Sequence, residues 1–292
     1  MKIVVASGKG GTGKSMLASS MSILFSKTSR VIACDCDVDA PNLGLWLGIT
    51  EYDSKKKIST SEKAYINPEK CAECGECFEA CKFGAIERTG GFTIDPLLCE
   101  GCGVCQLVCP ADAIELNKVM NGEIRINETQ LGFPLVSGQL YPGETGSGKI
   151  VQELRRKAEE FDHDFMILDS AAGIGCPVIA SVTGCDFALL VTEPTPTGFT
   201  DLGRILEIVN HFQIPFGIVL NKWDINPTLS EKIESWGGER LLGKIPYDRK
   251  VVDSIVNLKP VVYSDTAVTS EISKIFEKLK VHNKNATSLR TL

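Results

Sequence analysis

The sequence lacks any apolar run long enough to cross a membrane and any apolar leader at its start. A membrane-spanning helix needs about 20 consecutive apolar residues, and no segment of the 292-residue chain approaches that. The first residues form a short apolar segment that leads directly into a glycine-rich loop, which is not the pattern of a secretory signal. We therefore expect a soluble, cytoplasmic protein with no stable membrane association.

Histidine and excess positive charge are also scarce. The three histidines lie far apart in sequence, which excludes a histidine-rich metal centre and a catalytic triad built on histidine. Asp and Glu outnumber Lys and Arg by 37 to 31, giving a net charge of −6. Because no basic face can attract phosphate backbones, nucleic acid is not an expected partner.

Short apolar segments alternate with amphipathic ones along most of the chain, which predicts an α/β fold. Such alternation is typical of a mainly parallel sheet with helices on both faces. Residues 51–63 are polar and are interpreted as a linker. The expected strands are 2–6, 31–34, 165–169, 187–193, 216–222 and 240–246, and the expected helices are 14–25, 147–161, 199–211, 229–236, 248–256 and 268–280.

The strongest motif is GKGGTGKS at residues 8–15, which lies between the first expected strand and the first expected helix. It matches the phosphate-binding pattern GxxxxGK[ST] and predicts a P-loop. Glycines let backbone N–H groups point inward, and the following helix presents its positive end to phosphate oxygens. Lys14 is expected to contact the β- and γ-phosphates. The expected nucleotide-binding residues here are Gly8, Lys9, Gly10, Gly11, Thr12, Gly13, Lys14, Ser15 and Met16.

Lys9, at the second loop position, makes this motif resemble the deviant Walker A motif KGGxGK[ST] of the MinD/Mrp and nitrogenase iron-protein superfamily. Two acidic segments at strand ends, residues 35–39 (DCDVD) and 169–175 (DSAAGIG), resemble its switch segments. The resemblance implies ATP or ADP with Mg²⁺ as ligands, ATP hydrolysis, and a homodimer on ATP binding. In that dimer Lys9 would reach the partner's phosphates.

The same resemblance assigns roles to individual residues. Asp37 would orient the attacking water, and the Gly173 amide would sense the γ-phosphate. The implied catalytic residues are Lys9, Lys14, Asp37 and Asp169, and the implied Mg²⁺ site is formed by Ser15, Asp35, Asp37 and Asp169. The residues implied to line the adenine are Asn221, Pro246, Tyr247 and Asp248.

Eight of the 12 cysteines form two CxxCxxCxxxC blocks, 28 residues apart. Clustered cysteines in a reducing compartment indicate metal or redox sites rather than disulfides. Structural zinc is an alternative, but the blocks resemble a bacterial ferredoxin with two [4Fe–4S] clusters, in which each fourth cysteine binds the other cluster. That implies Cys71, Cys74, Cys77 and Cys109 for cluster 1, and Cys99, Cys102, Cys105 and Cys81 for cluster 2.

These motifs divide the chain. We expect a P-loop ATPase domain at residues 1–58 and 120–282, an inserted α+β ferredoxin-like domain with two clusters at 59–119, and a flexible tail at 283–292. Cys176 occupies the position of a cluster ligand in the nitrogenase iron protein and is a possible extra thiol ligand, although the preceding GETGSGK segment has no second cysteine.

The main functional hypothesis is an ATPase whose nucleotide state gates electron transfer through two [4Fe–4S] clusters to a partner protein. One alternative is a carrier of iron–sulfur clusters or an assembly ATPase for a metalloprotein. Another is a regulatory ATPase whose clusters sense redox state. The sequence does not identify the redox or metalloprotein partner.

Overall fold

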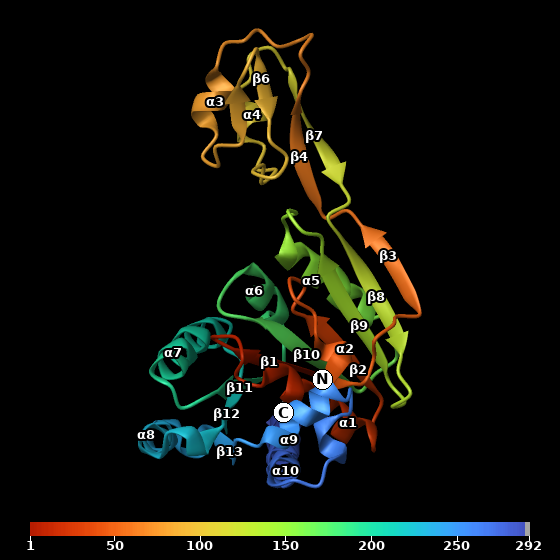
Figure 1. Cartoon of the computed structure of the whole chain (residues 1–292), viewed down its shortest axis with the longest axis vertical. Coiled ribbons are helices and arrows are strands. Elements are labelled where there is room, and N and C mark those ends of the chain that lie inside the picture. The colour runs from red at the N-terminus through yellow and green to blue at the C-terminus, as the bar shows by residue number, and fades with distance from the viewer. Residues whose placement is uncertain (290–292) are drawn as a thin grey trace.

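The computed structural model describes the backbone of residues 1–289 and the side chains of residues 1–281. A broad body carries a small module that stands away from it on a narrow two-stranded stalk (Figure 1). Residues from both ends of the chain build the body, and a central segment builds the module. Among the described residues, no helix is long and apolar enough to cross a membrane.

The body is built on a nine-stranded sheet with the order β13-β12-β11-β1-β10-β2-β9-β8-β3. All neighbouring pairs from β13 to β9 are parallel, whereas β8 and β3 are antiparallel additions at one edge. The mainly parallel sheet expected from the sequence is therefore confirmed. Its strands are β1 (Lys2–Ser7), β2 (Val31–Cys36), β3 (Ser54–Ile58), β8 (Gly122–Glu128), β9 (Pro134–Leu140), β10 (Phe165–Ala172), β11 (Phe187–Thr192), β12 (Phe216–Asn221) and β13 (Leu241–Ile245).

Helices cover both faces of this sheet because strand side chains alternate between two buried layers. On β1, Ile3 and Val5 pack in the core with α1 and α10, whereas Val4 and Ala6 face the core shared with α5, α6 and α7. The body helices are α1 (Lys14–Ser26), α2 (Leu43–Trp46), α5 (Ser147–Ala158), α6 (Cys176–Val182), α7 (Pro196–His211), α8 (Pro227–Gly237), α9 (Arg249–Val256) and α10 (Ala267–Leu289).

The module is a small insertion with two antiparallel hairpin ladders. Strands β4 (Ser61–Ile66) and β7 (Ile114–Val119) form the stalk, and β5 (Ile86–Arg88) pairs with β6 (Phe92–Ile94). Two short helices, α3 (Glu76–Ala80) and α4 (Val104–Leu107), complete it. The module leaves the sheet edge between β3 and β8, so it does not interrupt the parallel strands.

Three expectations differ from the structure. Residues 51–63 do not form a linker, because they contain β3 and the start of β4. Strand β9 was not expected from the sequence. Helix α10 continues to Leu289 and so enters the segment expected to be a flexible tail, while residues 290–292 lie outside the described part of the chain.

Candidate functional site

The P-loop follows β1 at the carboxyl edge of the parallel sheet, where open α/β sheets bind ligands. Gly11 and Gly13 have φ values of 78° and 94°, a left-handed conformation that glycine adopts without steric cost. Gly8 lies against α7, where a Cβ atom would come 2.0 Å from the Asp201 carbonyl oxygen. The loop can therefore curl closely only because glycine occupies these positions.

Lys14 extends from the first turn of α1 into a group of carboxylates. Its Nζ lies 3.3 Å from Asp169 Oδ1 and 4.0 Å from Asp37 Oδ2. Asp35 and Asp169 occupy paired positions on the adjacent strands β2 and β10, and both are fully buried. The structure thus brings together residues from the predicted P-loop and from both predicted acidic segments.

These carboxylates raise one another's affinity for protons. Burial and the charge of Asp169 hold the pKa of Asp35 well above its usual value. Burial raises the pKa of Asp169, against the opposing effects of Lys14 and Ser15, and it also raises that of Asp37. For Lys14, burial favours the neutral amine, but Asp169 and Asp37 outweigh it and raise the pKa.

Thr12 Oγ1 in the P-loop and Asp169 Oδ2 are among the buried polar atoms of the described chain that have no hydrogen-bond partner. Buried polar atoms are normally paired with protein, water or a ligand. Mg²⁺ is usually held by one or two carboxylates together with phosphate oxygens and water, and the unpaired oxygen of Asp169 fits such a partial site. The donor set therefore suits Mg²⁺ bound together with a nucleotide phosphate.

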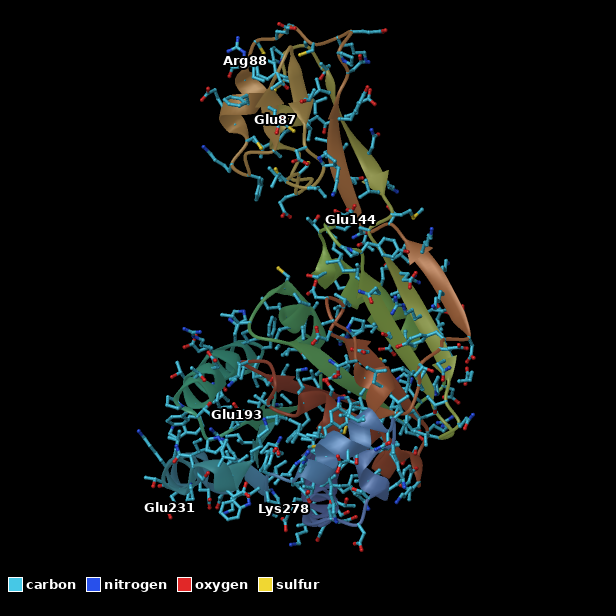
Figure 2. All side chains as sticks on the ribbon, in the orientation of Figure 1. Glu87, Arg88, Glu144, Glu193, Glu231 and Lys278 are labelled. Atoms are coloured by element: carbon cyan, nitrogen blue, oxygen red, sulfur yellow. The ribbon has the colours of Figure 1, made fainter. Side chains whose placement is uncertain are left out.

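Sequence reasoning missed two residues of this site, Glu193 and Lys222. Glu193 lies in the body just beyond β11 (Figure 2). Its Oε1 accepts from Lys9 Nζ at 2.7 Å, and its Oε2 accepts from Lys222 Nζ at 3.0 Å. Lys222 Nζ also donates to the Gly11 carbonyl at 2.9 Å. Glu193 ends the apolar run FALLVTE, so its place after a strand was the available signal. In this conformation the Lys9 side chain contacts a residue of its own chain rather than reaching towards a second subunit.

The remaining predicted nucleotide-binding residues lie near the loop in different ways. Asn221 Nδ2 donates to the Thr12 carbonyl at 2.8 Å. Asn221 pairs with Ile245 in the sheet, so residues 246–248 emerge at the same edge. The Met16 side chain is buried in the core. The Gly173 amide donates to the Ser7 carbonyl at 3.0 Å and would have to leave it to reach a phosphate.

In the module, the eight clustered cysteines surround two separate cavities. Cys71, Cys74, Cys77 and Cys109 line the first, and the second is lined by Cys81, Cys99, Cys102 and Cys105. Each cavity thus takes three cysteines from one block and the fourth from the other. Among the described residues, no group of three or more His, Cys, Asp or Glu side chains is arranged to hold a single metal ion.

The two halves of the module have the same local geometry. Positive φ values recur at equivalent positions of the two blocks, at Glu73 and Gly101, Gly75 and Gly103, and Gly84 and Asp112. Backbone N–H groups of Ala64 and Ala113 donate to the sulfurs of Cys99 at 3.4 Å and Cys109 at 3.3 Å. Four cysteine sulfurs around a cavity, with N–H donors to some of them, fit an iron–sulfur cluster.

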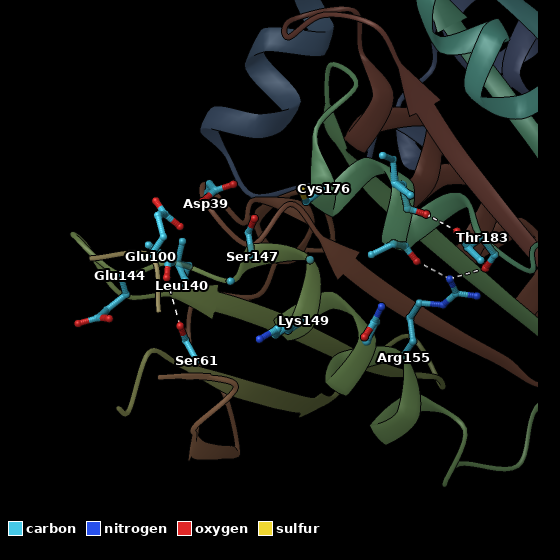
Figure 3. A pocket seen from close by; sticks show the side chains of 16 residues that line it. Asp39, Ser61, Glu100, Leu140, Glu144, Ser147, Lys149, Arg155, Cys176 and Thr183 are labelled. Atoms are coloured by element: carbon cyan, nitrogen blue, oxygen red, sulfur yellow. Dashed lines mark hydrogen bonds between the residues drawn. The ribbon is translucent and has the colours of Figure 1, made fainter. Parts of the chain in front are cut away.

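The other four cysteines lie in the body. Cys34, Cys36 and Cys185 are buried, and burial raises the pKa of the Cys185 thiol to about 11. Cys176 is exposed at the start of α6 and lines a cleft of about 920 Å³ between the body and the module (Figure 3). Asp39 of the body and Glu100 of the module line the same cleft. Cys176 is therefore not in either cysteine-lined cavity.

In a comparison with known proteins, residues 3–261 match the family of the CobQ/CobB/MinD/ParA nucleotide binding domain. An uncharacterized protein of Methanocaldococcus jannaschii is 39% identical over 96% of both chains. The iron–sulfur cluster carrier protein of Pyrococcus horikoshii is 26% identical over 95% of this chain and 85% of its own length.

Among solved structures, the septum site-determining protein MinD of Pyrococcus horikoshii, complexed with Mg-ADP, superposes with a TM-score of 0.59. The superposition covers 95% of each chain at 17% sequence identity. At this identity the likeness shows the fold, which agrees with the sheet order and helix layers described above.

Proposed function

Because the chain belongs to the CobQ/CobB/MinD/ParA nucleotide-binding family, we propose that it is an ATPase whose nucleotide state controls iron–sulfur clusters held in its inserted module. One observation carries the proposal. The same chain contains a P-loop whose lysine lies among carboxylates and two cavities that are each lined by four cysteines.

The body residues provide for hydrolysis by positioning and charge neutralisation, which dominate catalysis of phosphoryl transfer. Lys14 contacts the β- and γ-phosphates. Ser15 with Asp35, Asp37 and Asp169 forms the Mg²⁺ site, and bound Mg²⁺ offsets phosphate charge. Asp37 orients a water whose oxygen attacks the γ-phosphorus as the bond to ADP breaks.

When ATP binds, two contacts within the body break. Lys9 leaves Glu193, 2.7 Å away, and reaches the phosphates of the second subunit of a homodimer. The Gly173 amide leaves the Ser7 carbonyl, 3.0 Å away, and contacts the γ-phosphate. Asn221 and residues 246–248 line the adenine. Lys9 is part of the P-loop and Ser7 directly precedes it, so bound ATP can replace both contacts.

The module holds two [4Fe–4S] clusters, which supply one-electron chemistry or serve as cargo. Cys71, Cys74, Cys77 and Cys109 bind the first, and Cys81, Cys99, Cys102 and Cys105 bind the second. Each cluster thereby crosslinks the two halves of a segment that has little apolar core of its own, as expected for a small metal-stabilised module.

The output we favour is cluster carrying or metalloprotein assembly, since relatives covering nearly the whole chain are named iron–sulfur cluster carrier proteins. Electron transfer is the second candidate. It is favoured by the burial of Cys77, Cys99 and Cys105, because buried ligands help to retain a cluster, whereas the exposure of Cys74 and Cys102, one at each cavity, favours release.

The proposal is tested by anaerobic purification, measurement of iron and sulfide, and ATPase assays. We expect about eight iron atoms per chain, the number in two such clusters, and hydrolysis that Lys14→Ala abolishes without loss of iron. Protein that hydrolyses ATP but contains zinc or no metal would contradict it. Two incubations then separate the outputs. A carrier transfers iron and sulfide to an apo-ferredoxin, whereas an electron carrier keeps its iron and sulfide and, once reduced, is reoxidised by a cluster-loaded ferredoxin, which accepts the electrons.

A further inference from the structure

The junction between body and module is held by one fully buried asparagine. Asn121 Oδ1 accepts from the Thr60 amide at 2.8 Å, and its Nδ2 donates to the Thr145 carbonyl at 2.7 Å. Its backbone carbonyl accepts from the Tyr141 amide at 3.0 Å. The two strands of the stalk are thus tied both to each other and to the loop that precedes α5.

That loop, residues 141–146, rises from the body to meet the stalk. Ser61 Oγ lies 3.1 Å from Thr145 Oγ1, and Lys63 Nζ forms an ion pair with Glu144 Oε2 at 3.0 Å. Figure 2 shows Glu144 at the junction, and Figure 3 shows the bond between Ser61 and the loop. The Lys63 side chain is almost entirely buried, whereas 23% of the Glu144 side chain is exposed, so the pair is partly shielded from solvent.

Lys63 also holds the segment that carries the second cysteine cavity. Its Nζ donates to the Pro96 carbonyl at 2.5 Å, and the amide of the next residue, Ala64, donates to Cys99 Sγ at 3.4 Å. Gly101 packs so closely on β4 that a Cβ atom would lie 2.0 Å from the Glu62 carbonyl oxygen. Movement of Lys63 is therefore expected to displace residues 95–101, which we call the Cys99 loop.

One end of residues 140–148 contacts the first acidic segment of the nucleotide site, and the other end lies against Cys176, the residue directly after the second acidic segment. The Leu140 amide donates to the Val38 carbonyl at 2.8 Å, beside Asp37. At Gly148, a Cβ atom would lie 3.2 Å from the Cys176 Cβ atom. Cys176 follows the turn that contains Gly173. Residues 140–148 thus contact the first acidic segment at one end, the residue that follows the second acidic segment at the other end, and the module in between.

We propose that the Lys63–Glu144 pair transmits the nucleotide state of the body to the Cys99 loop and so positions the second cysteine cavity. The proposal rests on the proposed function for the nucleotide. Because packed contacts shift as units rather than deform gradually, displacement of residues 140–148 moves Glu144, and Glu144 carries Lys63 and the Pro96 carbonyl with it. Lys63 and Glu144 are positioning residues and touch no nucleotide.

Hydrogen–deuterium exchange of the full-length protein, with and without Mg²⁺ and a non-hydrolysable ATP analogue, tests this relay. In the wild type, nucleotide should change the exchange of the Cys99 loop. Glu144→Gln and Lys63→Met should each reduce that change to less than half, while nucleotide affinity by calorimetry stays within twofold. Glu153→Gln is the matched control, because Glu153 lies on α5 and pairs with the exposed Arg156.

The relay is contradicted if the Cys99 loop of the wild type does not respond to nucleotide, or if it responds equally in Glu144→Gln. An unresponsive wild-type loop contradicts the relay without any variant. If the buried Lys63→Met variant fails to fold, Glu144→Gln decides, because Glu144 is the more exposed partner and the substitution keeps its size. Iron content and ATP hydrolysis, measured on the same preparations, report separately on the proposed function. Exchange reads backbone amides, so it tests the relay whatever metal the protein contains.

Discussion

Asp35→Asn should stabilise the nucleotide-free protein. Asp35 is fully buried and pairs in the sheet with Asp169, on a strand about 5 Å away. Two charges at that distance repel by ~3 kcal/mol at an effective dielectric constant of about 20. The Asp35 carboxylate accepts two backbone hydrogen bonds, and the substitution weakens the one from the Asp37 amide at 3.3 Å. Loss of that bond costs about 1 kcal/mol of stability. Lys14 offsets part of the repulsion, so we expect a net gain of about 1–2 kcal/mol at pH 8.

The pH dependence follows from the direction of the shift. The pKa of Asp35 is raised in the folded protein by burial and by Asp169, so its ionised form destabilises the fold. That penalty is complete above the raised pKa and is absent below the ordinary aspartate value of about 3.9. The advantage of Asp35→Asn should therefore shrink as the pH falls from 8 towards 4.

Urea unfolding followed by tryptophan fluorescence measures this in buffer without nucleotide or divalent cations. Trp46, Trp223 and Trp236 all lie in the body, so the signal reports on the body and not on the module. Asp39→Asn, which alters an exposed carboxylate of the same segment, is the control and should change stability by less than about 0.5 kcal/mol. A loss of stability at pH 8 in Asp35→Asn, or a gain that does not depend on pH, would refute the reasoning.

Three further predictions concern single contacts. Cys81→Ser should remove one cluster and leave the cluster of Cys71, Cys74, Cys77 and Cys109, as read by iron content and electron paramagnetic resonance; equal loss of both would argue against the exchanged fourth ligand. Gly101→Ala should destabilise the module by about 1–3 kcal/mol more than Gly84→Ala in limited proteolysis, because both glycines have positive φ but only Gly101 faces a backbone atom. Glu193→Gln should free Lys9 and strengthen ATP-dependent self-association by about two- to fivefold in sedimentation experiments, since partly exposed ion pairs contribute roughly 0.5–1 kcal/mol; weaker association would contradict it.

Six of the seven parallel strands, all but β9, were predictable because their apolar runs are uninterrupted and each meets a helical segment. The P-loop and the acidic segments were predictable because each lies at the end of such a run. The structure brings Lys14, Asp35, Asp37 and Asp169 together. It also groups the cysteines as the resemblance implied, while their roles in binding stay predictions.

The features that the sequence did not reveal depend on long-range pairing or on exposure. Glu193 meets Lys9 because β11 lies beside β1, a neighbour relationship that no local pattern encodes. Strand β3 carries three successive exposed lysines, so it lacks the apolar alternation by which strands are recognised. Strand β9 begins at Pro134 and contains Gly138, both of which are signals of a turn.

The position of β3 has a consequence for how the chain tolerates its extra module. An outermost strand leaves backbone groups open to pairing with other molecules, and lysines along it discourage such aggregation. Lys55, Lys56 and Lys57 provide that protection next to the point where the module departs. Because the module is attached outside the parallel strands, its loss or replacement would leave every hydrogen bond among β13, β12, β11, β1, β10 and β2 unchanged. The fold of the nucleotide-binding body is therefore compatible with gain or exchange of the cysteine-rich module without any change to these parallel strands.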